Sequence, residues 1–110
     1  MSSTRIFEIR TYQSAPGKRE ALKRRFHDHT FGLFAKHGIE VVSFYESLDD
    51  EDSIVYVLAY PSPEAAESYW KSFATDEDWI AARAASEVDG KLTSKIESHH
   101  YRATEFSPQQ

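Results

Sequence analysis

The chain has 110 residues, of which 40% are hydrophobic and 14% aromatic, and its formal net charge is −5. This composition predicts one globular domain over residues 1–110, with its core at about residues 5–105. The acidic balance argues against a nucleic-acid partner, which would need a clustered basic excess. No apolar run approaches the roughly 20 residues that cross a bilayer, so we expect neither a membrane partner nor a signal peptide after Met1. The lack of cysteine fits a cytoplasmic location.

The first expected strand follows a short tail at residues 1–4 and has two different faces. Phe7 and Ile9 alternate with Glu8, Arg10 and Tyr12 along it. Because side chains alternate across a strand, we expect Phe7 and Ile9 to enter the core and the polar residues to line the opposite face. If a partner covers that face, the polar row becomes an enclosed lining where function can reside.

A proline-glycine turn then introduces a helix, which we predict over residues 18–36. Its apolar residues recur at helical spacing, and the same spacing places His29 on the arc that faces the sheet. A basic cluster near its start includes Arg25 and is interpreted as a solvated helix face. The helix is expected to stop at Gly38, a residue that tolerates the left-handed conformation.

The second half of the chain repeats this pattern with more helix. Residues 39–46 and 53–60 predict an antiparallel hairpin. Ser62 and Pro63 begin a helix, a separate helix begins near Asp76, and residues 93–104 form the last strand. The order β-α-β-β-α(α)-β predicts an α+β, ferredoxin-like protomer, with a four-stranded antiparallel sheet and helices on one face.

The uncovered face of that sheet is expected to be too apolar to remain in water. On the third strand it would present Ile54, Tyr56, Leu58 and Tyr60. A contiguous apolar patch of this kind marks an interface, and burying it is favourable by about 25 cal/mol per Å². We therefore expect a homodimer formed through the sheet face.

Three blocks of sequence resemble the NIPSNAP family. The first is Glu8-Ile9-Arg10-Thr11-Tyr12 with the following Pro16-Gly17-Lys18, and the second runs from His29-Thr30 to His37-Gly38-Ile39. The third contains Trp70, Phe73, Asp76, Trp79 and Ala82-Arg83-Ala84. The blocks occur in the same order as in the family, and the resemblance covers about residues 6–108.

The resemblance implies membership of the dimeric α/β-barrel superfamily, and hence the same protomer and a sheet-to-sheet dimer. That superfamily includes cofactor-independent monooxygenases, haem-degrading monooxygenases and small isomerases, whose pockets lie between the helices and the sheet. Its cofactor-free monooxygenases commonly have a pocket asparagine. This chain has no asparagine, which weakens a monooxygenase assignment.

Three polar residues are candidates for catalysis. His29 is the best candidate for a general base, although a histidine on an apolar arc is more often a hydrogen-bonded core residue. Arg10 could hold a negative oxygen while Glu8 moves a proton. The alternative, which we favour, is that Glu8 and Arg10 form a structural pair inside an interface.

The remaining candidates would bind a substrate. They are aromatic except for one arginine: Tyr12, Tyr56, Tyr60, Trp70, Trp79 and Arg83. The tryptophans have the spacing of core residues, and Arg83 is also placed to pair with Glu87 one turn later. No histidine or carboxylate spacing indicates a metal site, and no cofactor is expected.

Two functions follow as hypotheses. The first is a homodimer that binds a small aromatic or acidic molecule. The second is a cofactor-independent monooxygenase or isomerase acting on an enolisable aromatic or polyketide-like compound. The sequence leaves open whether the chain is an enzyme, and whether the pocket lies between helices and sheet or inside the dimer barrel.

Overall fold

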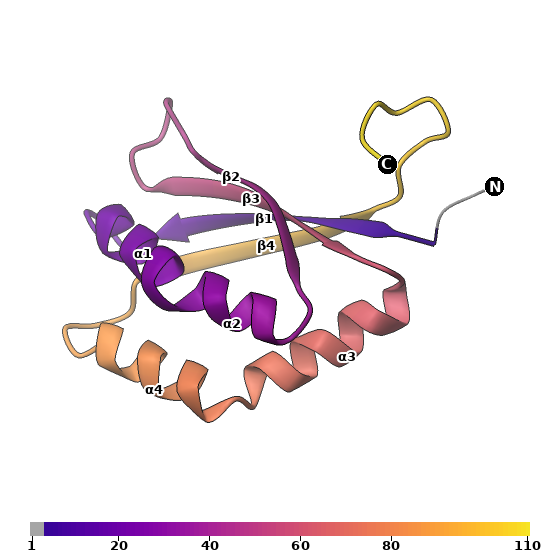
Figure 1. Cartoon of the computed structure of the whole chain (residues 1–110). Coiled ribbons are helices and arrows are strands. Elements are labelled where there is room, and N and C mark those ends of the chain that lie inside the picture. Colours follow the sequence, from indigo (N-terminus) through magenta and orange to yellow (C-terminus); the bar gives the residue numbers. More distant parts are fainter. Residues whose placement is uncertain (1–3) are drawn as a thin grey trace.

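The structure is a computed structural model that describes residues 4–110, so the predicted tail residues 1–3 lie outside the described residues. Its elements are β1 (Ile6–Ser14), α1 (Arg19–Arg25), the π-helical turn η1 (Phe26–Thr30), α2 (Phe31–Lys36), β2 (Glu40–Glu46), β3 (Ser53–Tyr60), α3 (Pro63–Ala74), α4 (Glu77–Ser86) and β4 (Thr93–Tyr101). The strands form one antiparallel sheet in the order β2-β3-β1-β4, with the helices on one face (Figure 1). The predicted ferredoxin-like α+β fold is confirmed.

Side-chain caps divide the second helical region into α3 and α4. The Ser62 hydroxyl accepts a hydrogen bond from the Ala65 backbone nitrogen at 3.1 Å, and Pro63 opens α3. The Asp76 carboxylate caps α4 by accepting from the Asp78 backbone nitrogen at 2.8 Å. The two helices therefore run one after the other beneath the sheet, where they form one wall of the candidate site (Figure 1).

The helices cover the sheet face that we expected to be the dimer interface. Tyr56, predicted at the interface, is fully buried, and its ring centroid lies 5.1 Å from that of Phe26 on η1. Phe7 and Ile9, predicted in the core, lie on the other face by strand alternation. Both faces carry apolar residues, so alternation separates the two sets without saying which set the helices cover. The following strand residues share the helix-covered core: Tyr12, Ile54, Tyr56, Leu58 and Tyr60.

The opposite side of the sheet, the outer face, is apolar at its centre. The register places Phe7 beside Ala59 and Ile9 beside Val57, with Val55 next along β3. Ile9, Val55 and Val57 are half-buried, although no helix covers them. We define the outer face by these five residues.

The first helical region contains a π-helical turn that changes which side chains face the sheet. The Thr30 hydroxyl donates to the Arg25 backbone oxygen, five residues earlier, at 3.3 Å. A π turn holds an extra residue, so the side chains within it no longer follow the regular helical arc. Thr30 takes the inward position and His29 is exposed. The predicted inward orientation of His29 is therefore wrong. The predicted solvation of Arg25 is also wrong, because this last residue of α1 is buried.

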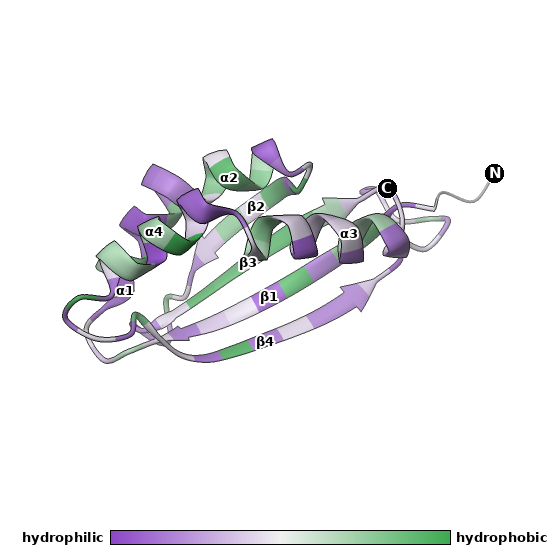
Figure 2. Ribbon diagram, turned by 90° about the horizontal axis from the view of Figure 1, so that it is seen from below, coloured by the Kyte–Doolittle hydropathy of each residue, from purple (hydrophilic) through white to green (hydrophobic). Residues whose placement is uncertain are grey.

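Strand β4 is left largely uncovered. Its residues after Thr93 are all exposed, and Figure 2 shows β4 along one edge of the sheet with no helix over it. Within residues 4–110, no helix has the length and apolar character required to cross a membrane.

Candidate functional site

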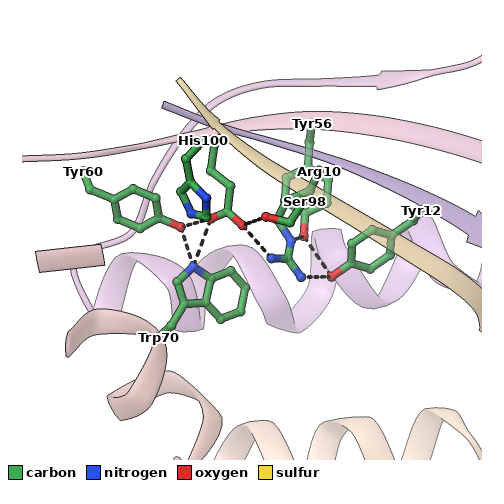
Figure 3. Close-up of polar contacts among 8 residues, drawn as sticks. Arg10, Tyr12, Tyr56, Tyr60, Trp70, Ser98 and His100 are labelled. Atoms are coloured by element: carbon green, nitrogen blue, oxygen red, sulfur yellow. Dashed lines mark hydrogen bonds and ion pairs between the residues drawn. The ribbon is translucent and has the colours of Figure 1, made fainter. Parts of the chain in front are cut away.

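A buried carboxylate organises the polar residues on the helix side of the sheet. Glu8 is only 2% exposed, and four side chains donate hydrogen bonds to it. Its Oε1 accepts from Tyr60 at 2.5 Å and from the Trp70 indole at 3.2 Å. Its Oε2 accepts from Arg10 at 2.7 Å and from Ser98. Figure 3 shows how β1, β3, β4 and α3 bring these groups together.

The Arg10 guanidinium is hydrogen-bonded at each of its three nitrogens. Its Nε donates to the Tyr56 hydroxyl at 2.9 Å, and one Nη donates to the Tyr12 hydroxyl at 3.1 Å. The other Nη binds Glu8, and the guanidinium carbon lies 4.5 Å from the Trp70 ring centroid. Hydrogen bonds at all three nitrogens and a cation–π contact hold this side chain in one orientation.

This network fixes the protonation of its members. Burial raises the pKa of Glu8, but hydrogen bonds from Ser98, Tyr60 and Arg10 outweigh it, so the pKa lies below its usual value. Burial and the hydrogen bond to Glu8 raise the pKa of Tyr60. Glu8 therefore remains a carboxylate at neutral pH. A carboxylate held by four donors is a poor proton acceptor, so the geometry favours an orienting role for Glu8.

A cavity of about 200 Å³ lies beside this network, between the helices and strands β1 and β4. We call it the inner cavity. Its wall is mainly aromatic, and it includes Tyr12, Phe34, Trp70, Phe73 and Trp79. Its charged lining residues are Arg25, Arg83 and Glu87.

A second, more open cavity of about 590 Å³ lies between α3 and the end of β4. We call it the end groove. Ile6, Pro63 and His100 line it, and Trp70 lines both cavities. His100 Nε2 lies 3.9 Å from Glu8 Oε1 (Figure 3). The end groove therefore places an imidazole beside a buried carboxylate.

The structure brings together only part of the predicted site. Four predicted binding residues line the inner cavity: Tyr12, Trp70, Trp79 and Arg83. Tyr56 and Tyr60 are buried in the polar network and line neither cavity. Glu8 and Arg10 hold Tyr12 and Trp70 in place. His29 is exposed and lines neither cavity.

Sequence reasoning missed Arg25 and His100. Arg25 was assigned to the solvent because it belongs to a basic cluster that we interpreted as a solvated helix face. The register of β4 on β1 pairs His100 with Glu8, so the two side chains lie on the same face of the sheet. The alternation of side chains along each strand does not reveal which residues are paired. Among residues 4–110, no three histidine or acidic side chains gather as a metal site.

Comparisons with known proteins agree with this architecture. The NIPSNAP family model matches residues 7–108. A NIPSNAP family protein from Agrobacterium tumefaciens is 21% identical, with a TM-score of 0.84 and 100% of both chains covered. A NIPSNAP-like domain protein from Burkholderia xenovorans is 14% identical, with a TM-score of 0.83, covering 96% of this chain and 90% of that one.

A more distant structure is a candidate antibiotic biosynthesis monooxygenase from Caulobacter crescentus. It is 20% identical, with a TM-score of 0.67, and covers 94% of this chain and 92% of that one. No curated protein sequence matches the chain. Likeness at these identities extends to the fold, whereas the family match spans nearly the whole sequence. The chain therefore belongs to the NIPSNAP family.

Proposed function

We propose that this chain acts as a homodimer that binds a small aromatic or acidic molecule in the inner cavity. The observation that carries the proposal is that Tyr12, Trp70, Trp79 and Arg83 line one cavity. Aromatic walls with a few convergent polar groups are typical of small-molecule sites. An apolar cavity of about 150 Å³ accepts benzene, so about 200 Å³ accommodates one substituted ring.

The rigidity of the cavity wall supports binding. Trp70 donates to Glu8 and Tyr60 and stacks against Arg10, so its ring is already oriented. A wall held in this way loses little conformational freedom when a ligand binds, which favours affinity.

The experiment is a thermal-shift screen with benzoate, phenol and indole, followed by titration calorimetry. A ligand that binds only the folded state raises the melting temperature. Ile96→Trp places a large side chain at the cavity lining and should abolish the shift. Ile80→Trp is the matched control, because Ile80 is also an exposed apolar residue but does not line the cavity. No shift with any aromatic probe, or equal shifts in both variants, would contradict the proposal.

The homodimer is supported by the outer face. Its half-buried apolar residues are Ile9, Val55 and Val57, and the helices cover only the other side of the sheet. Pairing two outer faces would remove this surface from water. A chain without cysteine also fits a reducing compartment, and we place the dimer in the cytoplasm as part of this proposal.

A second candidate function is proton abstraction from an enolisable aromatic compound, the first step of a cofactor-independent isomerase or oxygenase. The observation that favours it is His100, which lies 3.9 Å from Glu8 and beside Trp70 in the end groove. An imidazole is a suitable general base, and a carboxylate 3.9 Å away would stabilise the positive charge that the imidazole gains with the proton. In this candidate His100 takes the role that we predicted for His29.

Deuterium exchange tests this second candidate. The probe is 2-tetralone in deuterium oxide, with loss of its α-proton signal followed by NMR. We expect the protein to accelerate exchange and His100→Gln to remove the acceleration. His99→Gln is the matched control, because the neighbouring strand residue points to the other face. If exchange is no faster than in buffer, or if His100→Gln leaves it unchanged, proton abstraction by His100 is contradicted.

A further inference from the structure

One buried arginine at the inner cavity has most of its hydrogen-bonding capacity unused. The Arg25 side chain is 6% exposed and lines the cavity, with its guanidinium carbon 5.3 Å from the Trp79 ring centroid. Only one Nη is hydrogen-bonded within residues 4–110, to Ser86 Oγ at 3.1 Å and Glu87 Oε2 at 3.5 Å. Its Nε is buried without a partner in that part of the chain. A guanidinium carries five donor hydrogens, so Arg25 is poorly satisfied.

The charge around the cavity is positive although the whole chain is acidic. Arg25, Arg83 and Glu87 are its charged lining residues, which gives a local charge of +1 in a chain of net charge −5. Glu87 also binds Arg83, at 3.4 Å, so one carboxylate is shared between two guanidinium groups. Burial lowers the pKa of Arg25, and Glu87 only partly offsets this effect. A second anion at the cavity would relieve the imbalance.

We propose that Arg25 is the anion-binding residue of the inner cavity, and that the ligand is a single-ring aromatic carboxylate. The carboxylate contacts the Arg25 guanidinium, and the ring lies against Trp79. This proposal rests on the proposed binding function and narrows its ligand class. The cavity volume of about 200 Å³ limits the ligand to one ring with a small substituent. Planar guanidinium groups pair well with carboxylates, because two parallel hydrogen bonds form at once.

The first test compares two probes of the same shape on the unmodified protein. Benzoate carries the charge, whereas benzamide has the same ring and a neutral planar group. Because hydrogen bonds to charged groups are stronger, we expect calorimetry to show benzoate binding at least about tenfold more tightly than benzamide. Equal affinities would overturn the role of Arg25 while leaving the binding function intact. Failure of both probes, and of phenol and indole, would instead remove the binding function itself.

The second test changes the arginine. Arg25→Gln should remove the preference, so that benzoate and benzamide bind about equally, and Arg25→Lys should retain part of the preference. Arg24→Gln is the matched control, because it removes the same charge from the same helix at an exposed position outside the cavity. The proposal is overturned if Arg25→Gln keeps the full preference or if Arg24→Gln loses it equally. If Arg25→Gln does not fold, the comparison of benzoate and benzamide on the unmodified protein decides.

Discussion

Replacing Glu8 by glutamine should destabilise the fold more than any exposed charge change. Gln keeps the shape of the side chain but turns one oxygen into an NH₂ group. Whichever oxygen is replaced, the new donor faces a group that can only donate: Trp70 at Oε1 or Arg10 at Oε2. The change also leaves Arg10, whose side chain is only 14% exposed, without its counter-ion. Removing one partner of a buried ion pair costs about 3–5 kcal/mol, and we expect a loss of that size.

The assay is urea denaturation at pH 7, followed by tryptophan fluorescence at one fixed protein concentration, because the proposed dimer would make stability depend on concentration. Glu46→Gln is the control, since Glu46 pairs with Lys23 at the surface and should matter little. We expect Glu8→Gln to lower the midpoint strongly with an unchanged slope. If the two variants have the same midpoint, the Glu8 network does not stabilise the fold and the reasoning is refuted.

Three further predictions follow from the outer face, the end of α2 and the start of α4. Val57→Asp places a charge at the centre of the outer face and should give monomers by light scattering, whereas exposed Val88→Asp should not. Gly38 has φ +85, and an added Cβ would lie 3.0 Å from the Tyr69 ring, so Gly38→Ala should lower stability by at least about 1 kcal/mol in thermal melts. The control is Gly32→Ala, which should raise stability slightly because the space around Gly32 is open. Hydrogen bonds from a lysine and a histidine at the end of α2 hold the pKa of Asp76 below its usual range. The stability it contributes is therefore present above the ordinary carboxyl pKa and lost as pH falls below about 4; Asp76→Asn should flatten this loss in urea titrations between pH 7 and pH 3.

The helices and strands could be predicted from the sequence, but the side of the sheet that the helices cover could not. Alternation along β1 and the Ser62 cap predicted strands and helices close to those observed, because both signals are local. The side of β1 that meets the helices depends on which of two apolar faces packs better, and this is a property of the whole sheet. Tyr56 and Ile9 lie on the opposite sheet faces from those we predicted for that reason.

Only part of the site could be predicted from the sequence. Tyr12 and Trp70 were selected by residue type, and they line the same cavity in the structure, where Trp70 on α3 is hydrogen-bonded to Glu8 on β1. Arg25 was missed because it belongs to a basic cluster that we interpreted as solvated, although it follows Leu22 at helical spacing on the buried side of α1. His29 was misplaced because the π turn adds a residue and changes which side chains face the sheet. A π turn depends on packing around Phe26 and Thr30, so a regular helical period cannot reveal it.

The two buried arginines differ in a way that decides which of them can receive a ligand. Arg10 is hydrogen-bonded at all three nitrogens and its charge is already paired with Glu8, so it offers an incoming anion fewer unused donors. Within residues 4–110, Arg25 is bonded at one nitrogen, so an anion can form hydrogen bonds there without breaking any. Because affinity reflects the hydrogen bonds that form on binding minus those that must break, the less satisfied arginine is the better receptor. Arg10 contributes to binding indirectly, because it packs against Trp70 and so fixes one wall of the same cavity.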